Sequence, residues 1–97
     1  MSSLGQALLE KIQSRTARTG VVGLGYVGLP LAVEFAKSGF HTTGIDLDAR
    51  KVHAVAEGRS TIPDVARADV RSLVDAGTLD ATTDFSVVRT LDTINIC

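Results

Sequence analysis

The sequence predicts an α/β fold in which strands of a parallel β-sheet alternate with helices. Short β-prone segments and helical patterns follow one another along the chain in the order β-α-β-α-α-β-α-β. Strands that are separated by a helix pair in parallel, because the helix carries the chain back to the same end of the sheet. Glycines cluster at the first strand-to-helix junction, over 23–28. These observations predict a parallel sheet with crossover helices and a functional turn at that junction.

The glycine cluster has the spacing G-x-G-x-x-G, with Gly23, Gly25 and Gly28 as its three glycines. An apolar run over 21–22 precedes it, and an apolar pattern of helical period over 31–36 follows it. A strand, a tight turn and a helix in this order are the context in which the spacing indicates dinucleotide binding. We therefore interpret this junction as a phosphate-binding turn.

Each glycine has a predicted role in that turn. Gly23 allows the sharp turn out of the strand, Gly25 allows a pyrophosphate to approach the backbone, and Gly28 allows the helix to pack closely on the strand. The unpaired N–H groups and the dipole of the helix N-terminus favour phosphate. Proline is tolerated only early in a helix. Pro30 therefore predicts a helix that starts near Tyr26.

A predicted second strand, over 42–45, ends in Asp46. Asp46 follows Gly28 at close to the spacing of about 20 residues that is typical of the carboxylate that binds the adenosine ribose. This carboxylate favours NAD, because a 2′-phosphate would meet a like charge. The alternative is that Asp46 serves only as a helix cap or turn residue.

These features together predict a Rossmann-type three-layer parallel sheet with strand order 3-2-1-4. The fold is expected to be truncated after the fourth strand, because a complete domain of this type has about six strands. We divide the chain into an N-terminal helical extension, 1–18, and a partial NAD-binding domain, 19–97. The extension contains a predicted extra helix over 3–14, which packs either on the domain or on a second subunit. Its apolar face has helical period and consists of Leu4, Leu8, Leu9 and Ile12.

Two further helices are bracketed by capping residues. Asp48 is the expected N-cap of a helix over 49–57, with Gly58 just past its C-terminus. Two cations, Arg50 and Lys51, occupy its first turn against the preference of the helix dipole. Arg50 and Lys51 either reach the ribose or a phosphate, or lie on the surface.

The second of these helices is expected over 65–76, with Asp64 as its N-cap and Gly77 closing it. A short strand over 80–82, a helical turn capped by Thr83 or Asp84 and a last strand over 93–97 complete the predicted fold.

Composition restricts the function. The net charge of −1 gives no reason to expect a nucleic-acid partner or an anionic membrane, and no apolar run approaches the length of a membrane span. The single cysteine, Cys97, excludes an internal disulfide and is compatible with a reducing cytoplasm. We expect a cytoplasmic protein.

Three stretches resemble the N-terminal NAD-binding domain of the UDP-glucose/GDP-mannose dehydrogenase family. They are G-V-V-G-L-G-Y-V-G-L-P-L-A-V-E-F-A at 20–36, G-I-D-L-D at 44–48 and A-T-T-D-F at 81–85. The resemblance covers nearly all of 18–97, and L-G-Y-V-G-L-P is far more specific than the glycines alone. The predicted lead-in helix and R-T-A-R at 15–18 look most like the branch that acts on UDP-N-acetylglucosamine or related N-acetylhexosamines.

The resemblance implies a four-electron oxidation of a sugar C6 alcohol to a carboxylate. The family uses two NAD⁺ and a covalent thiohemiacetal on a catalytic cysteine. It also implies that Asp46 holds the adenosine ribose and that Lys51 assists it. The residues that would line the pyrophosphate are Gly23, Gly25, Tyr26, Val27 and Gly28.

This chain departs from the family pattern in ways that affect function. The catalytic cysteine of the family lies in a downstream G-G-x-C-x-x-K-D-type motif that the chain lacks, and Cys97 does not take its role. Asn95 stands between Ile94 and Ile96 where an apolar residue is typical. Burying an unpaired amide there would cost about 1–3 kcal/mol. Asn95 therefore marks either sequence drift or a strand that is exposed to solvent.

We expect the chain to be the NAD-binding part of a nucleotide-sugar dehydrogenase and to lack catalysis by itself. A UDP-sugar would be its partner only in the full-length enzyme. Homo-oligomerisation is expected through the exposed strand edge or the N-terminal helix. One alternative is a free-standing nucleotide-binding or interaction module without enzyme activity. Another is a Rossmann dehydrogenase of the 3-hydroxyacyl or 6-phosphogluconate type, which shares the glycine spacing but not G-Y-V-G-L-P.

Overall fold

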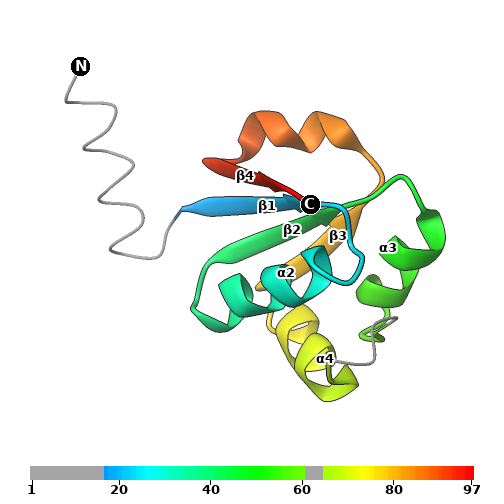
Figure 1. The fold of residues 1–97 in the computed structure, drawn as a ribbon. Coiled ribbons are helices and arrows are strands. Elements are labelled where there is room, and N and C mark those ends of the chain that lie inside the picture. Colours follow the sequence, from blue (N-terminus) through cyan, green and yellow to red (C-terminus); the bar gives the residue numbers. More distant parts are fainter. Residues whose placement is uncertain (1–16, 61–64) are drawn as a thin grey trace.

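The computed structural model describes residues 17–60 and 65–97, and these form one parallel sheet with helices on its faces (Figure 1). The sheet order is β3-β2-β1-β4, and every neighbouring pair is parallel. The predicted order 3-2-1-4 is therefore confirmed. The strands are β1 (Arg18–Val22), β2 (His41–Ile45), β3 (Leu79–Thr82) and β4 (Thr93–Ile96).

The connections between strands lie on both faces of the sheet, which gives the predicted three layers. Three α-helices cover one face, and the 3-10 helix η1 crosses the other (Figure 1). Crossovers between parallel strands are right-handed in nearly all proteins, so connections that run in opposite directions across a sheet lie on opposite faces. The chain moves outward from β1 to β3 and then returns past β1 to β4. The helices are α2 (Gly28–Lys37), α3 (Ala49–Ala56), α4 (Arg67–Asp75) and η1 (Phe85–Thr90).

The main core lies between the sheet and the three α-helices. Val21 from β1 and Leu79 from β3 meet side chains from all three helices there. Val55 of α3 and Val70 of α4 face inward as predicted and are almost fully buried, whereas Ala56, predicted on the same stripe as Val55, is exposed. The core thus holds the α2 end of the glycine turn rigidly against β1.

Helix α3 has both of its predicted caps. The Asp48 carboxylate accepts a hydrogen bond from the backbone N–H of Arg50 at 2.9 Å. At the other end, Gly58 has φ +72° and donates its N–H to the carbonyl of Val55. The N–H of Arg59 reaches the carbonyl of Ala54, which completes a Schellman motif. Gly77 closes α4 with the same geometry.

Two predicted helix starts are wrong by about one half-turn. Helix α2 begins at Gly28 and not near Tyr26. A helix from Tyr26 would need an N–H at residue 30 for the Tyr26 carbonyl, and Pro30 has none. Helix α4 begins at Arg67, with Ala66 as its N-cap and no side-chain capping bond. The proposed cap, Asp64, lies outside the described residues, as does the predicted helix over 3–14.

Most of the remaining differences are one residue in length, although η1 ends at Thr90, two residues beyond the predicted end of the helical turn at Val88. Strands β2 and β3 each begin one residue earlier than predicted, at His41 and Leu79, and β4 ends one residue earlier, at Ile96. Of the two candidate caps for the helical turn, Asp84 is the one that accepts a hydrogen bond, from the N–H of Ser86 at 2.9 Å.

Strand β4 is the least covered part of the sheet. Ile94 and Ile96 lie on the η1 face with 44% and 82% of their surfaces exposed. Asn95 lies on the α2 face beside Val21, its register partner on β1, and is half-buried. This result favours the second reading of Asn95, a strand in contact with solvent. No helix in the described part of the chain is long and apolar enough to cross a membrane.

Candidate functional site

The glycine turn is fixed between the ends of two neighbouring strands. Gly23 follows β1 with φ +97°, and its N–H donates a hydrogen bond to the carbonyl of Ile45 at 2.8 Å. On the other side, the N–H of Cys97 donates to the carbonyl of Val22 at 2.9 Å. A Cβ on Gly23 would lie 2.8 Å from the carbonyl oxygen of Cys97. The predicted sharp turn at Gly23 is therefore confirmed.

Gly25 and Gly28 are glycines for opposite reasons. A Cβ on Gly28 would overlap the carbonyl oxygen of Gly23 and touch the Val21 side chain. This confirms the close approach of the helix to the turn and strand. A Cβ on Gly25 would meet no atom within 4 Å. The bare backbone of Gly25 therefore borders open space, as a turn that cradles a phosphate requires.

Asp46 connects the glycine turn to the end of β2. Its Oδ2 accepts a hydrogen bond from the backbone N–H of Leu24 at 2.8 Å. Its Oδ1 accepts from the backbone N–H of Asp48, also at 2.8 Å. Asp46 therefore acts as a turn residue, as the alternative reading held. It also lines the pocket beside the glycines. These two N–H bonds leave acceptor capacity on both oxygens.

A pocket of about 300 Å³ gathers all the residues that the sequence proposed for the cofactor. The N-terminus of α2 borders it and contributes partial positive charge. Tyr26 and Val27 line it with 78% and 67% of their surfaces exposed. The lining residues are Gly23, Gly25, Tyr26, Val27, Gly28, Asp46, Lys51 and Cys97.

Cys97 is the one lining residue that the sequence reasoning missed. The signal was available, because the predicted order 3-2-1-4 places the fourth strand beside the first. Residues that follow neighbouring parallel strands lie at the same edge of the sheet. Cys97, the last residue of the predicted fourth strand, therefore had to lie beside Gly23.

A second, smaller pocket of about 190 Å³ adjoins the first on the η1 face and shares Gly23 and Asp46 with it. Its other walls are largely apolar, and Leu47 and Phe85 are 82% and 38% exposed. The sequence reasoning did not single out these two residues. An apolar residue directly after Asp46 was a signal, because it stands at the carboxyl edge of the sheet where ligands bind in such folds.

The two cations at the start of α3 have different environments. Lys51 lines the larger pocket. The Arg50 side chain is 92% exposed, and its Nε and Nη2 lie 3.3 Å from Oδ1 and Oδ2 of Asp48. Hydrogen bonds from the Arg50 side chain and then its backbone hold the pKa of the Asp48 carboxyl below its usual range. Arg50 is thus a surface residue, whereas Lys51 faces the pocket.

The site is not a metal centre of the usual kind. Across 17–60 and 65–97, no group of three or more His, Cys, Asp and Glu side chains is arranged to hold a metal ion. What the pocket offers is a bare backbone, a helix N-terminus, one carboxylate and one cation.

Comparison with known proteins gives the same assignment as the site. Residues 17–97 match the model of the UDP-glucose/GDP-mannose dehydrogenase family, NAD binding domain. A UDP-N-acetyl-D-mannosamine dehydrogenase of Pyrococcus horikoshii is 30% identical over 82 residues, which are 82% of this chain and 19% of that protein. An NDP-N-acetyl-D-galactosaminuronic acid dehydrogenase of Ralstonia nicotianae is 41% identical over 66 residues, which are 66% of this chain and 15% of the relative.

A solved structure shares the fold. The GDP-mannose dehydrogenase of Pseudomonas aeruginosa, crystallised as a ternary complex, superimposes with a TM-score of 0.79 at 32% identity. The match covers 82% of this chain and 19% of that one. The chain therefore spans about a fifth of the length of these relatives, or less. It belongs to the UDP-glucose/GDP-mannose dehydrogenase family, and its residues 17–97 fall within the NAD-binding domain of that family.

Proposed function

We propose that this chain is the NAD-binding N-terminal portion of a nucleotide-sugar 6-dehydrogenase, which oxidises a sugar C6 alcohol to a carboxylate. The observation that carries the proposal is the hydrogen bond between the Leu24 N–H and Asp46, which holds the glycine turn and the carboxylate at one pocket. NAD⁺, when held by these residues, would supply the hydride acceptor for the oxidation. The residues of this chain bind and orient the adenosine side of that cofactor.

The two adjoining pockets suggest how the cofactor is divided between them. In the larger pocket, Gly25 and Gly28 would hold the pyrophosphate beside the N-terminus of α2, and Tyr26 and Val27 would flank it. Asp46 lies where the two pockets meet and would accept hydrogen bonds from the ribose hydroxyls. Lys51, which lines the larger pocket with Asp46, would assist Asp46 by offsetting negative charge there.

The apolar pocket is the place for the adenine ring in this proposal. Leu47 and Phe85 form its exposed walls, and the ring of Phe85 offers a flat surface. A purine covers apolar side chains that are otherwise exposed to water, which is favourable by the hydrophobic effect. The ribose on Asp46 would then join the ring in one pocket to the pyrophosphate in the other.

The carboxylate of Asp46 also supports a preference for NAD over NADP. A 2′-phosphate would place negative charge against Asp46, and Arg50, the cation adjacent to Lys51 in the sequence, is already paired with Asp48. Like charges at close range disfavour binding.

We further propose that the chain by itself performs no oxidation. The sequence contains a single cysteine, Cys97, and its backbone is bonded to the end of β1 beside the pyrophosphate pocket. In the proposal, catalysis and the nucleotide-sugar site belong to the portion that the longer relatives contain beyond this region. The names of two of those relatives contain an N-acetylhexosamine or an N-acetylhexosaminuronic acid. An N-acetylated sugar nucleotide, as in the UDP-N-acetylglucosamine branch, is therefore the proposed substrate class, and the cytoplasm is the proposed location.

Titration with NAD and NADP, followed by backbone amide NMR, tests the binding proposal. We expect NAD to shift the amides of Gly25 and Leu24 with a dissociation constant weaker than about 1 μM, because only half of a dinucleotide site is present. NADP should bind at least about tenfold more weakly. Sugar oxidation by this chain alone would contradict the assignment of catalysis elsewhere.

The uncovered β4 supports a second candidate, a free-standing nucleotide-binding or interaction module. Within the described residues, β4 pairs only with β1 and leaves its other edge open. An open apolar edge favours pairing with another chain, so we propose self-association through β4. Sequencing beyond codon 97 separates the candidates, because a continuing frame with a later catalytic-cysteine motif supports the enzyme.

A further inference from the structure

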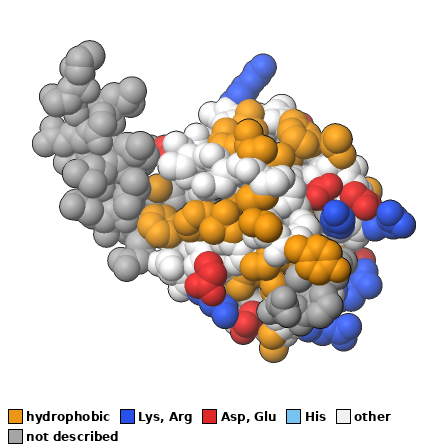
Figure 2. All heavy atoms as spheres, viewed as in Figure 1, with side chains coloured by type: hydrophobic (Ala, Val, Ile, Leu, Met, Phe, Trp, Pro, Cys, Tyr) orange, Lys and Arg blue, Asp and Glu red, His pale blue; other side chains and the backbone are white. Residues whose placement is uncertain are grey.

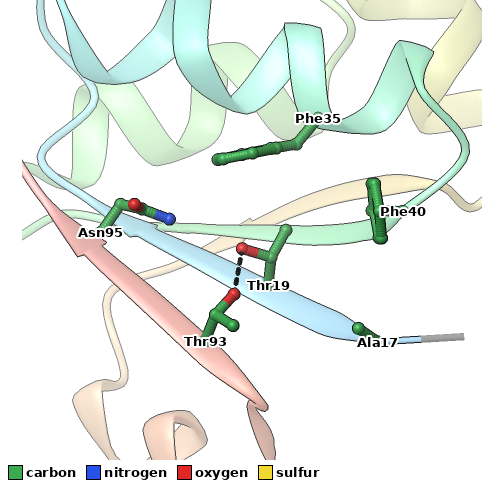
Figure 3. A pocket seen from close by; sticks show the side chains of 6 residues that line it. All are labelled: Ala17, Thr19, Phe35, Phe40, Thr93 and Asn95. Atoms are coloured by element: carbon green, nitrogen blue, oxygen red, sulfur yellow. Dashed lines mark hydrogen bonds between the residues drawn. The ribbon is translucent and has the colours of Figure 1, made fainter. Parts of the chain in front are cut away.

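A groove at the end of the sheet opposite the cofactor pocket has no described element over it. It has a volume of about 250 Å³ and lies where α2 meets the uncovered side of β4. Figure 3 shows Phe35 pointing from α2 toward the strands, while Asn95 and Thr93 point from β4 into the same space. The remaining lining residues are Ala17, Thr19 and Phe40.

The groove is mostly apolar apart from the Asn95 amide at its lining, and its two hydroxyl groups already have a partner in each other. The rings of Phe35 and Phe40 meet edge to face, with centroids 6.5 Å apart, and both are half-buried. The Thr93 hydroxyl donates a hydrogen bond to the Thr19 hydroxyl oxygen at 2.8 Å (Figure 3). An apolar occupant can therefore cover these two hydroxyls while each keeps one hydrogen-bond partner. Figure 2 shows hydrophobic side chains in a band between the sheet and α2, with charged groups gathered elsewhere on that face.

The chain enters the domain at this groove. Ala17, which directly precedes β1, is one of the lining residues. Residues 1–16 are therefore tethered to the rim of the groove, whatever their conformation. Within 3–14, the sequence places Leu4, Leu8, Leu9 and Ile12 at helical period. An isolated helix of this length is marginal in water, so its stability depends on a surface that covers its apolar face.

We propose that residues 3–14 pack as an amphipathic helix into this groove of the same chain. A helix over 3–14 is about 18 Å long, and only residues 15 and 16 separate it from Ala17. Such a short linker gives an effective concentration in the millimolar range. A second copy of the chain, at micromolar concentration, competes poorly with a tethered segment. Intramolecular packing is thus favoured over packing on another subunit, the other possibility that the sequence left open.

Paramagnetic broadening in the 97-residue chain tests the proposal. A nitroxide on Glu10→Cys, in a Cys97→Ser background, labels the polar face of the helix and leaves the leucines intact. We expect strong broadening of the amides of Thr19, Phe40 and Thr93 at the groove. The amides of Asp48 and Arg50, at the opposite edge of the sheet, should stay sharp. Unbroadened groove amides would overturn the proposal.

A matched pair of variants and a mixing experiment identify the occupant. Leu8→Asp, on the apolar face, should remove most of the broadening, whereas Gln13→Asp, on the polar face, should preserve it. Equal broadening in both variants would contradict helix docking through the apolar face. A mixture of isotope-labelled chains without nitroxide and spin-labelled chains without isotope should show no broadening. Broadening that appears only in that mixture would show that a second copy fills the groove, and the intramolecular proposal would fail.

Discussion

The backbone N–H of Leu24 and the carboxylate of Asp46 are 2.8 Å apart, and this hydrogen bond joins two segments that are 22 residues apart. The N–H of Asp48 occupies the other carboxylate oxygen at the same distance. Asp46 is therefore oriented by the fold in the absence of any ligand. The proposed ribose ligand and the glycine turn form one structural unit, so changes to Asp46 should affect stability and cofactor binding together.

Replacing Asp46 by Asn should lower both the free energy of unfolding and the affinity for NAD. The amide keeps one acceptor oxygen but turns an NH₂ group toward the second backbone N–H, which costs about 1–3 kcal/mol. NAD affinity should fall at least about tenfold because the charged acceptor for the ribose is lost. Urea unfolding and NAD titration measure the two effects. Asp84→Asn, at the cap of η1, is the matched control and should leave NAD affinity unchanged. Unaltered NAD binding by Asp46→Asn would rule out the ribose role.

Substitutions of Gly25 and Gly28 by alanine should separate effects on NAD binding from effects on folding stability. Gly25→Ala places its methyl group in open space, so stability should be nearly unchanged while NAD affinity falls at least about tenfold. Gly28→Ala pushes a methyl group into the Gly23 carbonyl and should cost about 1–3 kcal/mol of unfolding free energy, or more. Thermal unfolding and NMR titration distinguish the two variants. Wild-type NAD affinity in Gly25→Ala would contradict the proposed position of the pyrophosphate.

Lys51 and Arg50 are adjacent cations that the structure places differently, so a variant of Arg50 is a matched control for a variant of Lys51. Lys51→Ala should weaken NAD binding by about 1.4- to fivefold, since one solvent-accessible charge is worth about 0.2–1 kcal/mol. The loss should shrink at high salt. Arg50→Ala removes a side chain that is paired with Asp48 outside the pocket and should not change NAD affinity. If calorimetry gave equal losses for both variants, a direct role for Lys51 would be untenable.

Lowering the pH should remove the stability that the ionised Asp48 cap gives to the folded state. The Arg50 side chain and backbone lower the pKa of Asp48 in the folded state. A lowered pKa stabilises the fold fully above the unfolded pKa of about 3.9, and this contribution is lost as the pH falls through the folded value. Asn caps a helix without titrating. The stability difference between wild type and Asp48→Asn should therefore be largest above about pH 5 and shrink in acid. A pH-independent difference in urea unfolding would contradict the assignment.

The open edge of β4 should promote self-association. Ile96 is 82% exposed at the end of this strand, and a lysine there would oppose edge pairing. Light scattering over rising concentration should show oligomers for the wild type, with Ile96→Lys associating at least about tenfold more weakly. Ser72→Lys, on the exposed side of α4, adds the same charge far from β4 and should associate like the wild type. A wild type that stays monomeric at high concentration would argue against self-association through the edge of β4.

The sequence alone determined the order of the elements, the parallel sheet and most of the residues that line the pocket beside the glycine turn. Local chemistry specifies these features: Gly23 permits the positive φ that the turn requires, and Asp48 and Gly58 cap α3 through bonds to nearby residues. The start of α2 at Gly28 also has a local cause, because Pro30 has no N–H to donate to the carbonyl four residues back.

Only the tertiary structure decided what lies between elements that are distant in sequence. The bond from Leu24 to Asp46 and the apolar pocket of Leu47 and Phe85 depend on how strand ends meet at one edge. The groove beside Asn95 depends on which face of β4 the helices leave uncovered. Sequence spacing cannot specify such relationships, because they arise from packing between segments rather than from the conformational preferences within any one of them.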